Sequence, residues 1–140
     1  MKIRNAGLLS VFMAVSAVCA SAFQAPRSVR DGVYTEEQSK RGGQHFAEKC
    51  AMCHGSDLNG GEIAPALFGG NFMADWNGLT VGDLFERIRL SMPPSDPEQI
   101  TSQQRADIIA LILRTNGFPA GPKELDTRPE MLKQIKIEPK

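Results

Sequence analysis

The segment Cys50-Ala51-Met52-Cys53-His54 places two thiols and an imidazole within five consecutive residues. Because only two residues separate Cys50 from Cys53, a disulfide between them could not tie distant parts of the chain together. The cluster therefore indicates chemistry rather than crosslinking. Three kinds of site use such a cluster: a zinc site, a dithiol redox pair and the attachment point of a c-type haem.

The spacing of the cluster disfavours the first two alternatives. A zinc site needs four protein ligands, or three with an open position. His45 lies on a predicted helix that directs it elsewhere, and His54 directly follows Cys53. A dithiol oxidoreductase places its Cys-x-x-Cys pair at the start of a helix beside a strand. Here the pair follows a predicted helix, and no strand pattern accompanies it.

Cys-x-x-Cys-His is the attachment pattern of c-type haem. The two thiols add across the two vinyl groups on adjacent edges of the porphyrin. The histidine that follows then lies under the ring and presents a nitrogen to the iron. We therefore predict one covalent haem c, bound through Cys50 and Cys53, with His54 as the proximal iron ligand.

The sixth position of the iron needs another donor, and the sequence offers several. Met52 is held inside the motif, and Met131 lies near the C-terminus. Met73 lies in a glycine-rich segment, where a packing role is expected, and His45 is expected on the surface of its helix. Met92 follows a predicted helix and precedes two prolines, which stiffen the loop that would hold it. The sequence therefore predicts Met92 as the second axial ligand.

The N-terminus carries the pattern of a secretory signal peptide. Two basic residues precede an apolar run over residues 6–18, and Ala20-Ser21-Ala22 fits the small-x-small cleavage rule. The run is about 13 residues long, short of the roughly 20 that span a bilayer. We predict a signal peptide over 1–22, cleavage after Ala22, a periplasmic location and a mature chain without a transmembrane segment.

Capping patterns predict three helices, which run from 35 to about 49, from 80 to 90 and from 101 to 115. Asn116-Gly117 is typical of a helix C-terminus. Residues 55–79 are rich in glycine and predict mainly loop. The three predicted pairs of N-cap and capping-box partner are Thr35 with Gln38, Thr80 with Asp83, and Thr101 with Gln104.

These elements predict an all-α fold, a small helical domain over residues 35–121 wrapped around one haem. Residues 23–34 are expected to form a loose N-terminal arm. Residues 122–140 are expected to form a tail rich in proline and charge. Ile135 and Ile137 alternate with lysine there, but the pattern is too short to predict a strand. The chain holds 16 basic and 16 acidic residues with no basic patch, which argues against a nucleic-acid partner.

From Gly42 to Gly121 the chain resembles the class I cytochrome c family. Gly42 and Phe46 precede Cys50 by eight and four residues, as the glycine and aromatic of that family do. The resemblance implies that the final helix crosses the first helix at Gly42. Leu111 departs from the family, where many members have an aromatic residue.

The segment Ala64-Pro65-Ala66-Leu67 resembles the Pro-x-Leu loop of the same family. The resemblance implies that the carbonyl of Pro65 accepts a hydrogen bond from the free imidazole nitrogen of His54. Such a bond fixes the ring and raises its donor strength. It also implies that Leu67 presses on the haem.

A closer likeness is to the cytochrome modules that accompany quinone-cofactor dehydrogenases. It rests on Trp76, on Ser91-Met92-Pro93-Pro94 and on residues 116–121. Trp76 is expected to donate its indole hydrogen to a haem propionate. The alternative is a tryptophan that only covers the core.

Together these features predict an exported electron carrier with both axial positions filled and no catalytic residues. Its partners would be a redox donor and acceptor, such as a quinone-cofactor dehydrogenase or a terminal oxidase. Two alternatives stay open. One is a haem-bearing subunit of a periplasmic dehydrogenase or oxidase complex, and the other is a haem enzyme or gas sensor with an open sixth position.

Overall fold

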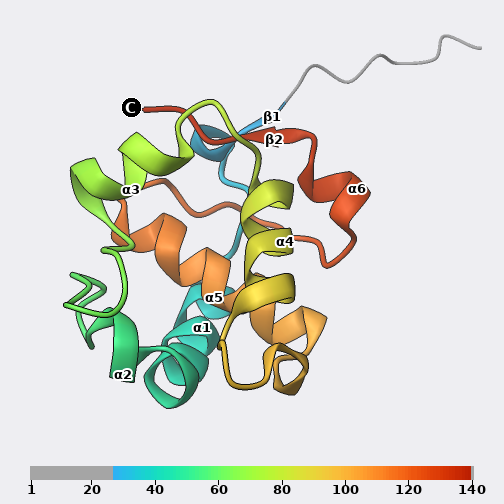
Figure 1. The fold of residues 1–140 in the computed structure, drawn as a ribbon. Helices are drawn as coiled ribbons and strands as arrows, with labels where there is room; N and C mark the ends of the chain where they lie inside the picture. The colour runs from blue at the N-terminus through green and yellow to red at the C-terminus, as the bar shows by residue number, and fades with distance from the viewer. Residues whose placement is uncertain (1–26, 140) are drawn as a thin grey trace, which may run out of the picture.

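The computed structural model describes residues 27–139, which form a helical domain with one short pair of parallel strands (Figure 1). The all-α prediction is confirmed. The predicted signal peptide, its cleavage site after Ala22 and Cys19 lie outside the described residues. The α-helices are α1 (Glu36–Lys49), α2 (Ala51–His54), α3 (Gly69–Trp76), α4 (Val81–Ser91), α5 (Ser102–Thr115) and α6 (Pro129–Leu132). The short elements are β1 (Arg27–Ser28), η1 (Val29–Asp31), η2 (Pro97–Gln99) and β2 (Ile135–Lys136).

Helices α1 and α5 cross in direct backbone contact at Gly42. A Cβ placed on Gly42 would lie 1.9 Å from the carbonyl oxygen of Asp107 in α5. No side chain fits at that separation, so glycine is what allows the two helices to approach. The crossing that the resemblance implied is therefore present.

Two of the three predicted capping boxes are complete. Both Thr80 and Thr101 accept from the backbone N–H three residues later, and the Asp83 and Gln104 side chains bond back to the N-cap N–H. Thr35 also accepts from the Gln38 N–H. The prediction that the Gln38 side chain bonds back to the Thr35 N–H is wrong.

The Gln38 side chain turns into the core instead. Its Nε2 donates to the carbonyl of Leu125 at 3.1 Å, and its Oε1 accepts from the Leu125 N–H at 2.6 Å. Gln38 is fully buried. A buried amide that matches one backbone donor and one acceptor satisfies four polar groups at once, which the solvent-exposed capping position would not do.

The segments predicted as a loose arm and a tail are packed onto the domain. Strand β1 pairs in parallel with β2, with Arg27 opposite Ile135, and both strands lie at the opposite end of the view from α2 (Figure 1). The prediction failed because these apolar residues are scattered, with only Ile135 and Ile137 in a short alternation, yet each is buried in the core. The buried apolar residues of the two segments are Val29, Val33, Tyr34, Leu125, Leu132, Ile135 and Ile137.

Helix α3 lies within the segment predicted as mainly loop. Its first two residues are glycines, which hide the helical signal in the sequence, and its N-cap Phe68 makes no side-chain capping bond. Phe72 is fully buried and stacks on Trp76 with ring centroids 6.3 Å apart. Tertiary packing of these aromatic rings compensates for the weak local propensity.

Within residues 27–139, every helix is too short or too polar to cross a lipid bilayer.

Candidate haem site

The Cys-x-x-Cys-His segment begins directly after α1: Cys50 caps both helices, and the other four residues form α2. Cys50 has φ −124° and ψ −32°, outside the helical range, and this break turns the chain from α1 into α2. Helix α2 then ends at Gly55, whose φ of +76° lies in the positive region that favours glycine. Cys50, Cys53 and His54 thereby line a single cavity.

The cavity has a volume of about 560 Å³, and most of its wall is apolar. Helices α1, α4 and α5 supply aliphatic and aromatic side chains to it, and others come from the loop before α3 and from Trp76 at the end of α3. A flat apolar cofactor would gain burial in such a cavity, at roughly 25 cal/mol for each Å² removed from water. The buried apolar lining residues are Phe46, Leu84, Ile88, Ile108 and Ile112.

His54 is buried, and its Nδ1 lies 2.8 Å from the carbonyl oxygen of Pro65. A carbonyl oxygen only accepts, so Nδ1 carries the proton and donates. Nε2 then keeps its lone pair and is the nitrogen available to a metal. The hydrogen bond that the resemblance implied is present, and both Pro65 and Leu67 line the cavity.

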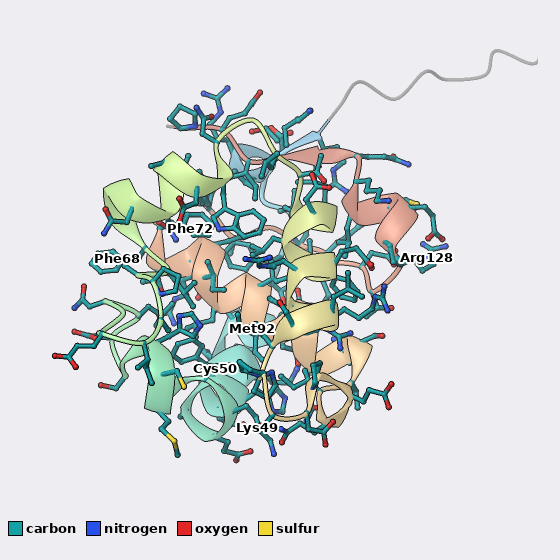
Figure 2. All side chains as sticks on the ribbon, in the orientation of Figure 1. Lys49, Cys50, Phe68, Phe72, Met92 and Arg128 are labelled. Carbon is teal, nitrogen blue, oxygen red and sulfur yellow. The ribbon has the colours of Figure 1, made fainter. Side chains whose placement is uncertain are left out.

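Met92 is the residue at which α4 ends, and its N–H donates to the Ile88 carbonyl at 2.9 Å. It lines the same cavity as the α2 residues, together with Pro93 and Pro94. Figure 2 labels Met92, at the end of α4, and Cys50, at the end of α1, two of the residues that line this cavity. A thioether and an imidazole in one apolar cavity fit the donor set of a haem iron.

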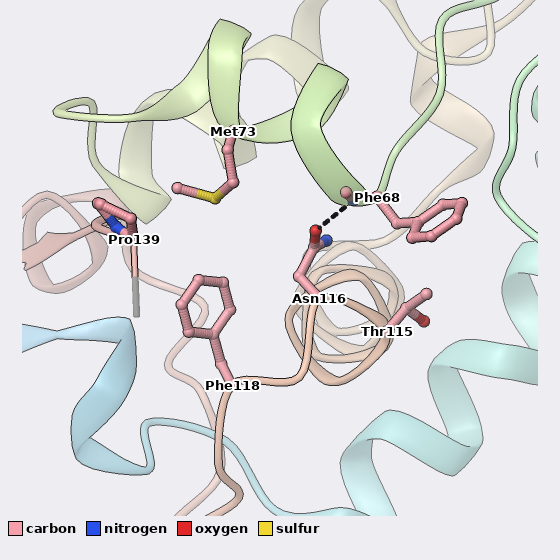
Figure 3. Close-up of a pocket in the computed structure, with 7 residues that line it drawn as sticks. Phe68, Met73, Thr115, Asn116, Phe118 and Pro139 are labelled. Atoms are coloured by element: carbon pink, nitrogen blue, oxygen red, sulfur yellow. Dashed lines mark hydrogen bonds between the residues drawn. The ribbon is translucent and has the colours of Figure 1, made fainter.

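The other candidate donors lie elsewhere. Met73 is on α3, not in a loop, and lines a separate cavity of about 300 Å³ beside Phe68 and Phe118 (Figure 3). The Nε2 of His45 lies 3.8 Å from Oδ2 of the buried Asp107, and His45 is not among the residues that line the larger cavity. The geometry therefore favours Met92 over both, and the ligand assignment stays a prediction.

Trp76 lines the larger cavity from α3. Three charged residues also line it: Lys49 from α1, Asp75 from α3 and Arg87 from α4. Arg87 was not predicted from the sequence as a residue of the site. Its spacing held the missing signal, because residues 84, 87 and 88 lie on one face of a helix. The role of Trp76 as a donor to a haem propionate stays a prediction.

The thiols do not suit a dithiol redox pair. Burial, with a smaller contribution from Cys53, raises the pKa of the Cys50 thiol to about 11. Redox-active pairs need a thiol with a lowered pKa, because the thiolate is the nucleophile. Within residues 27–139, no three His, Cys, Asp or Glu side chains are grouped so as to hold a metal ion, so the zinc alternative gains no support.

A Cys-x-x-Cys-His segment at the wall of an apolar cavity, with its histidine oriented by a carbonyl, defines a c-type cytochrome domain. Residues 37–112 match the family described as cytochrome c oxidase, cbb3-type, subunit III, and the chain belongs to this family. The family implies covalent haem c and an electron-transfer role. No curated protein and no solved structure matches the chain. The narrower likeness to quinone-dehydrogenase modules stays a prediction.

Proposed function

We propose that this protein is an exported electron carrier with one haem c, attached through Cys50 and Cys53 and ligated by His54 and Met92. One observation carries the proposal: all four side chains line the same largely apolar cavity. Both axial positions are then filled by the chain, so electron transfer rather than substrate binding is the supported activity.

When bound, haem supplies a one-electron couple at its iron. The chain supplies the surroundings. The apolar wall keeps water from the ring, and the Pro65 carbonyl orients His54 and strengthens it as a donor. A thioether at Met92 favours ferrous iron and raises the reduction potential relative to a second histidine. The indole of Trp76 is placed in the cavity wall, where it can donate to a propionate.

The donor and acceptor are redox proteins, for which a quinone-cofactor dehydrogenase and a terminal oxidase are the two proposed classes. The family description names an oxidase subunit, which supports the terminal oxidase. It also supports a second candidate function, a haem-bearing subunit held permanently in an oxidase complex. Purification of the native protein under mild conditions distinguishes a free carrier from a subunit.

The alternative of a haem enzyme or gas sensor requires an open sixth position. Met92 argues against it, because a flexible, polarizable thioether ends α4 at the cavity wall. Ferrous protein that binds carbon monoxide as fast as an open haem would favour this alternative.

The attachment is tested by expressing the full chain with a cytochrome c maturation system in a periplasm. We expect one haem per chain, retained after acid–acetone extraction, and an N-terminus at Phe23 by Edman or mass analysis. Cys50→Ser and Cys53→Ser should each lose one thioether bond. Cys19→Ser is the matched control, because Cys19 lies in the predicted signal peptide and should not affect attachment. Haem that extracts freely from the wild type would contradict the proposal.

A further inference from the structure

The side chain of Asn116, where α5 ends, is fully engaged with backbone groups. Its Nδ2 donates to the carbonyl of Ile112 at 2.8 Å and to the carbonyl of Leu67 at 3.0 Å. Its Oδ1 accepts from the N–H of Gly69 at 2.9 Å, the bond drawn in Figure 3. Asn116 thus joins the end of α5 to a segment that is 47 to 49 residues away in the sequence.

These partners require a carboxamide in one orientation. The backbone N–H of Gly69 can only donate, so the oxygen of Asn116 must face it. The carbonyl of Leu67 can only accept, so the nitrogen must face that side. An aspartate of the same shape would keep the first bond and place a carboxylate oxygen against the Leu67 carbonyl.

The segment that Asn116 holds forms part of the haem cavity. Within residues 60–67, two side chains from outside bond to the backbone: His54 to Pro65 and Asn116 to Leu67. Pro65 and Leu67 both line the cavity. The two hydrogen bonds therefore hold carbonyls that are two residues apart. One bond comes from the candidate iron ligand His54 and the other from Asn116 at the end of α5.

The hydrogen bond from the Gly69 N–H to Oδ1 of Asn116 extends the same support to α3. Gly69 begins α3, and the N-cap Phe68 offers no side-chain acceptor. The first N–H groups of a helix have no partner within the helix. Asn116 supplies the missing acceptor from α5, next to the Leu67 bond. Trp76, at the far end of α3, lines the cavity.

We propose that Asn116 is a positioning residue of the haem site, one that acts through Leu67 and Pro65 to hold the hydrogen bond of His54. The inference rests on the proposed function, in which His54 is an axial ligand. The Leu67 N–H keeps its own bond to the Leu58 carbonyl at 2.8 Å. Loss of Asn116 therefore loosens the 65–67 stretch at the Leu67 carbonyl, and the Nδ1 proton of His54 becomes more accessible to water.

The test measures solvent exchange of the His54 Nδ1 proton by NMR in the ferrous, haem-loaded protein. Asn116→Asp should exchange this proton about two- to tenfold faster than wild type, the range that corresponds to the net contribution of one neutral hydrogen bond. Amides in the middle of α1 should exchange as in wild type. Thr115→Ala is the matched control, because Thr115 precedes Asn116 and bonds only within its helix, to the Leu111 carbonyl at 2.9 Å.

Unchanged Nδ1 exchange in Asn116→Asp, or equally faster exchange in Thr115→Ala, would overturn the inference and leave the proposed function intact. A wild type that acquires no covalent haem would overturn the proposed function, and the inference with it. If Asn116→Asp does not accumulate, Asn116→Ser is measured in the same way. Serine is too short to reach both Leu67 and Gly69, so the same increase is expected.

Discussion

The carbonyl oxygen of Asp107 lies where a side chain on Gly42 would have to be: a Cβ there would come within 1.9 Å of it. Helices α1 and α5 consequently touch backbone to backbone. Phe46 in α1 and Ile108 in α5 follow this crossing by four residues and one residue, and both line the haem cavity. The crossing therefore helps to position two residues of the cavity wall.

Gly42→Ala should destabilise the protein by about 1–3 kcal/mol or more, because the overlap is with backbone and one helix must shift. Gly43→Ala is the matched control. Its Cβ would meet Leu111 Cδ1 at 3.9 Å, an ordinary contact, and alanine improves helix propensity by up to about 1 kcal/mol. Denaturant unfolding of the two haem-loaded variants measures both effects. Equal stabilities would contradict the assigned crossing.

Gln38→Ala should cost about 1–3 kcal/mol, because it leaves the buried N–H and carbonyl of Leu125 without partners. Gln134→Ala, an exposed glutamine of the same C-terminal segment, should change stability by less than about 0.5 kcal/mol. Limited proteolysis adds a local measurement, since cleavage between 122 and 128 should accelerate in Gln38→Ala only. An unaltered cleavage rate would show that the segment is held by other contacts.

How far the sequence predicts this structure depends on the range of the interactions. The haem motif and the caps at Thr80 and Thr101 depend on neighbouring residues, so the sequence predicts them. The crossing at Gly42 joins distant residues, and it was implied by the family resemblance. The pairing of Gln38 with Leu125 spans 87 residues. No periodic pattern of apolar residues near either position indicates this pairing, so the packing of the C-terminal segment was not predicted. The sequence predicts the cavity residues that belong to the haem motif. The positions of Arg87 and Asn116 at or beside the cavity become visible only in the folded structure.

Tyr34 is predicted to titrate well above an ordinary tyrosine. Its hydroxyl donates to the Phe118 carbonyl at 2.6 Å, and burial, with a contribution from Glu36, raises its pKa to about 12. A raised folded-state pKa favours the protonated phenol in the folded protein. Its contribution to stability is therefore complete below pH 10, the ordinary pKa, and is lost as the pH rises towards 12.

Tyr34 is the single tyrosine of the sequence, so the ultraviolet absorbance of tyrosinate reports on it alone. The folded protein should show a midpoint near 12, and the chain in denaturant one near 10. In Tyr34→Phe, the tyrosine-dependent loss of stability at alkaline pH should disappear. A folded-state midpoint near 10 would mean that the phenol is solvated and its bond to Phe118 is not maintained.

Met92→Ala should remove the sixth ligand while leaving the haem attached at Cys50 and Cys53. The ferric protein should shift towards high spin or take up water, and the charge-transfer band of sulfur-ligated iron should vanish. The reduction potential should fall, because a soft thioether that favours ferrous iron is lost. Ferrous Met92→Ala should bind carbon monoxide readily. Absorption spectra, redox titration and carbon monoxide binding measure these changes.

Met73→Ala is the control, because Met73 lines the smaller cavity with Phe68 and Phe118 and not the cavity of His54. It should keep the wild-type spectrum and lose about 2 kcal/mol of stability, since the side chain is only partly buried. If Met73→Ala instead shows the changes expected of Met92→Ala, and Met92→Ala does not, the sixth ligand is Met73. The proposal of an electron carrier would then still hold. If neither variant changes the spectrum, the sixth ligand is not a methionine, and the enzyme or gas-sensor alternative becomes the better account.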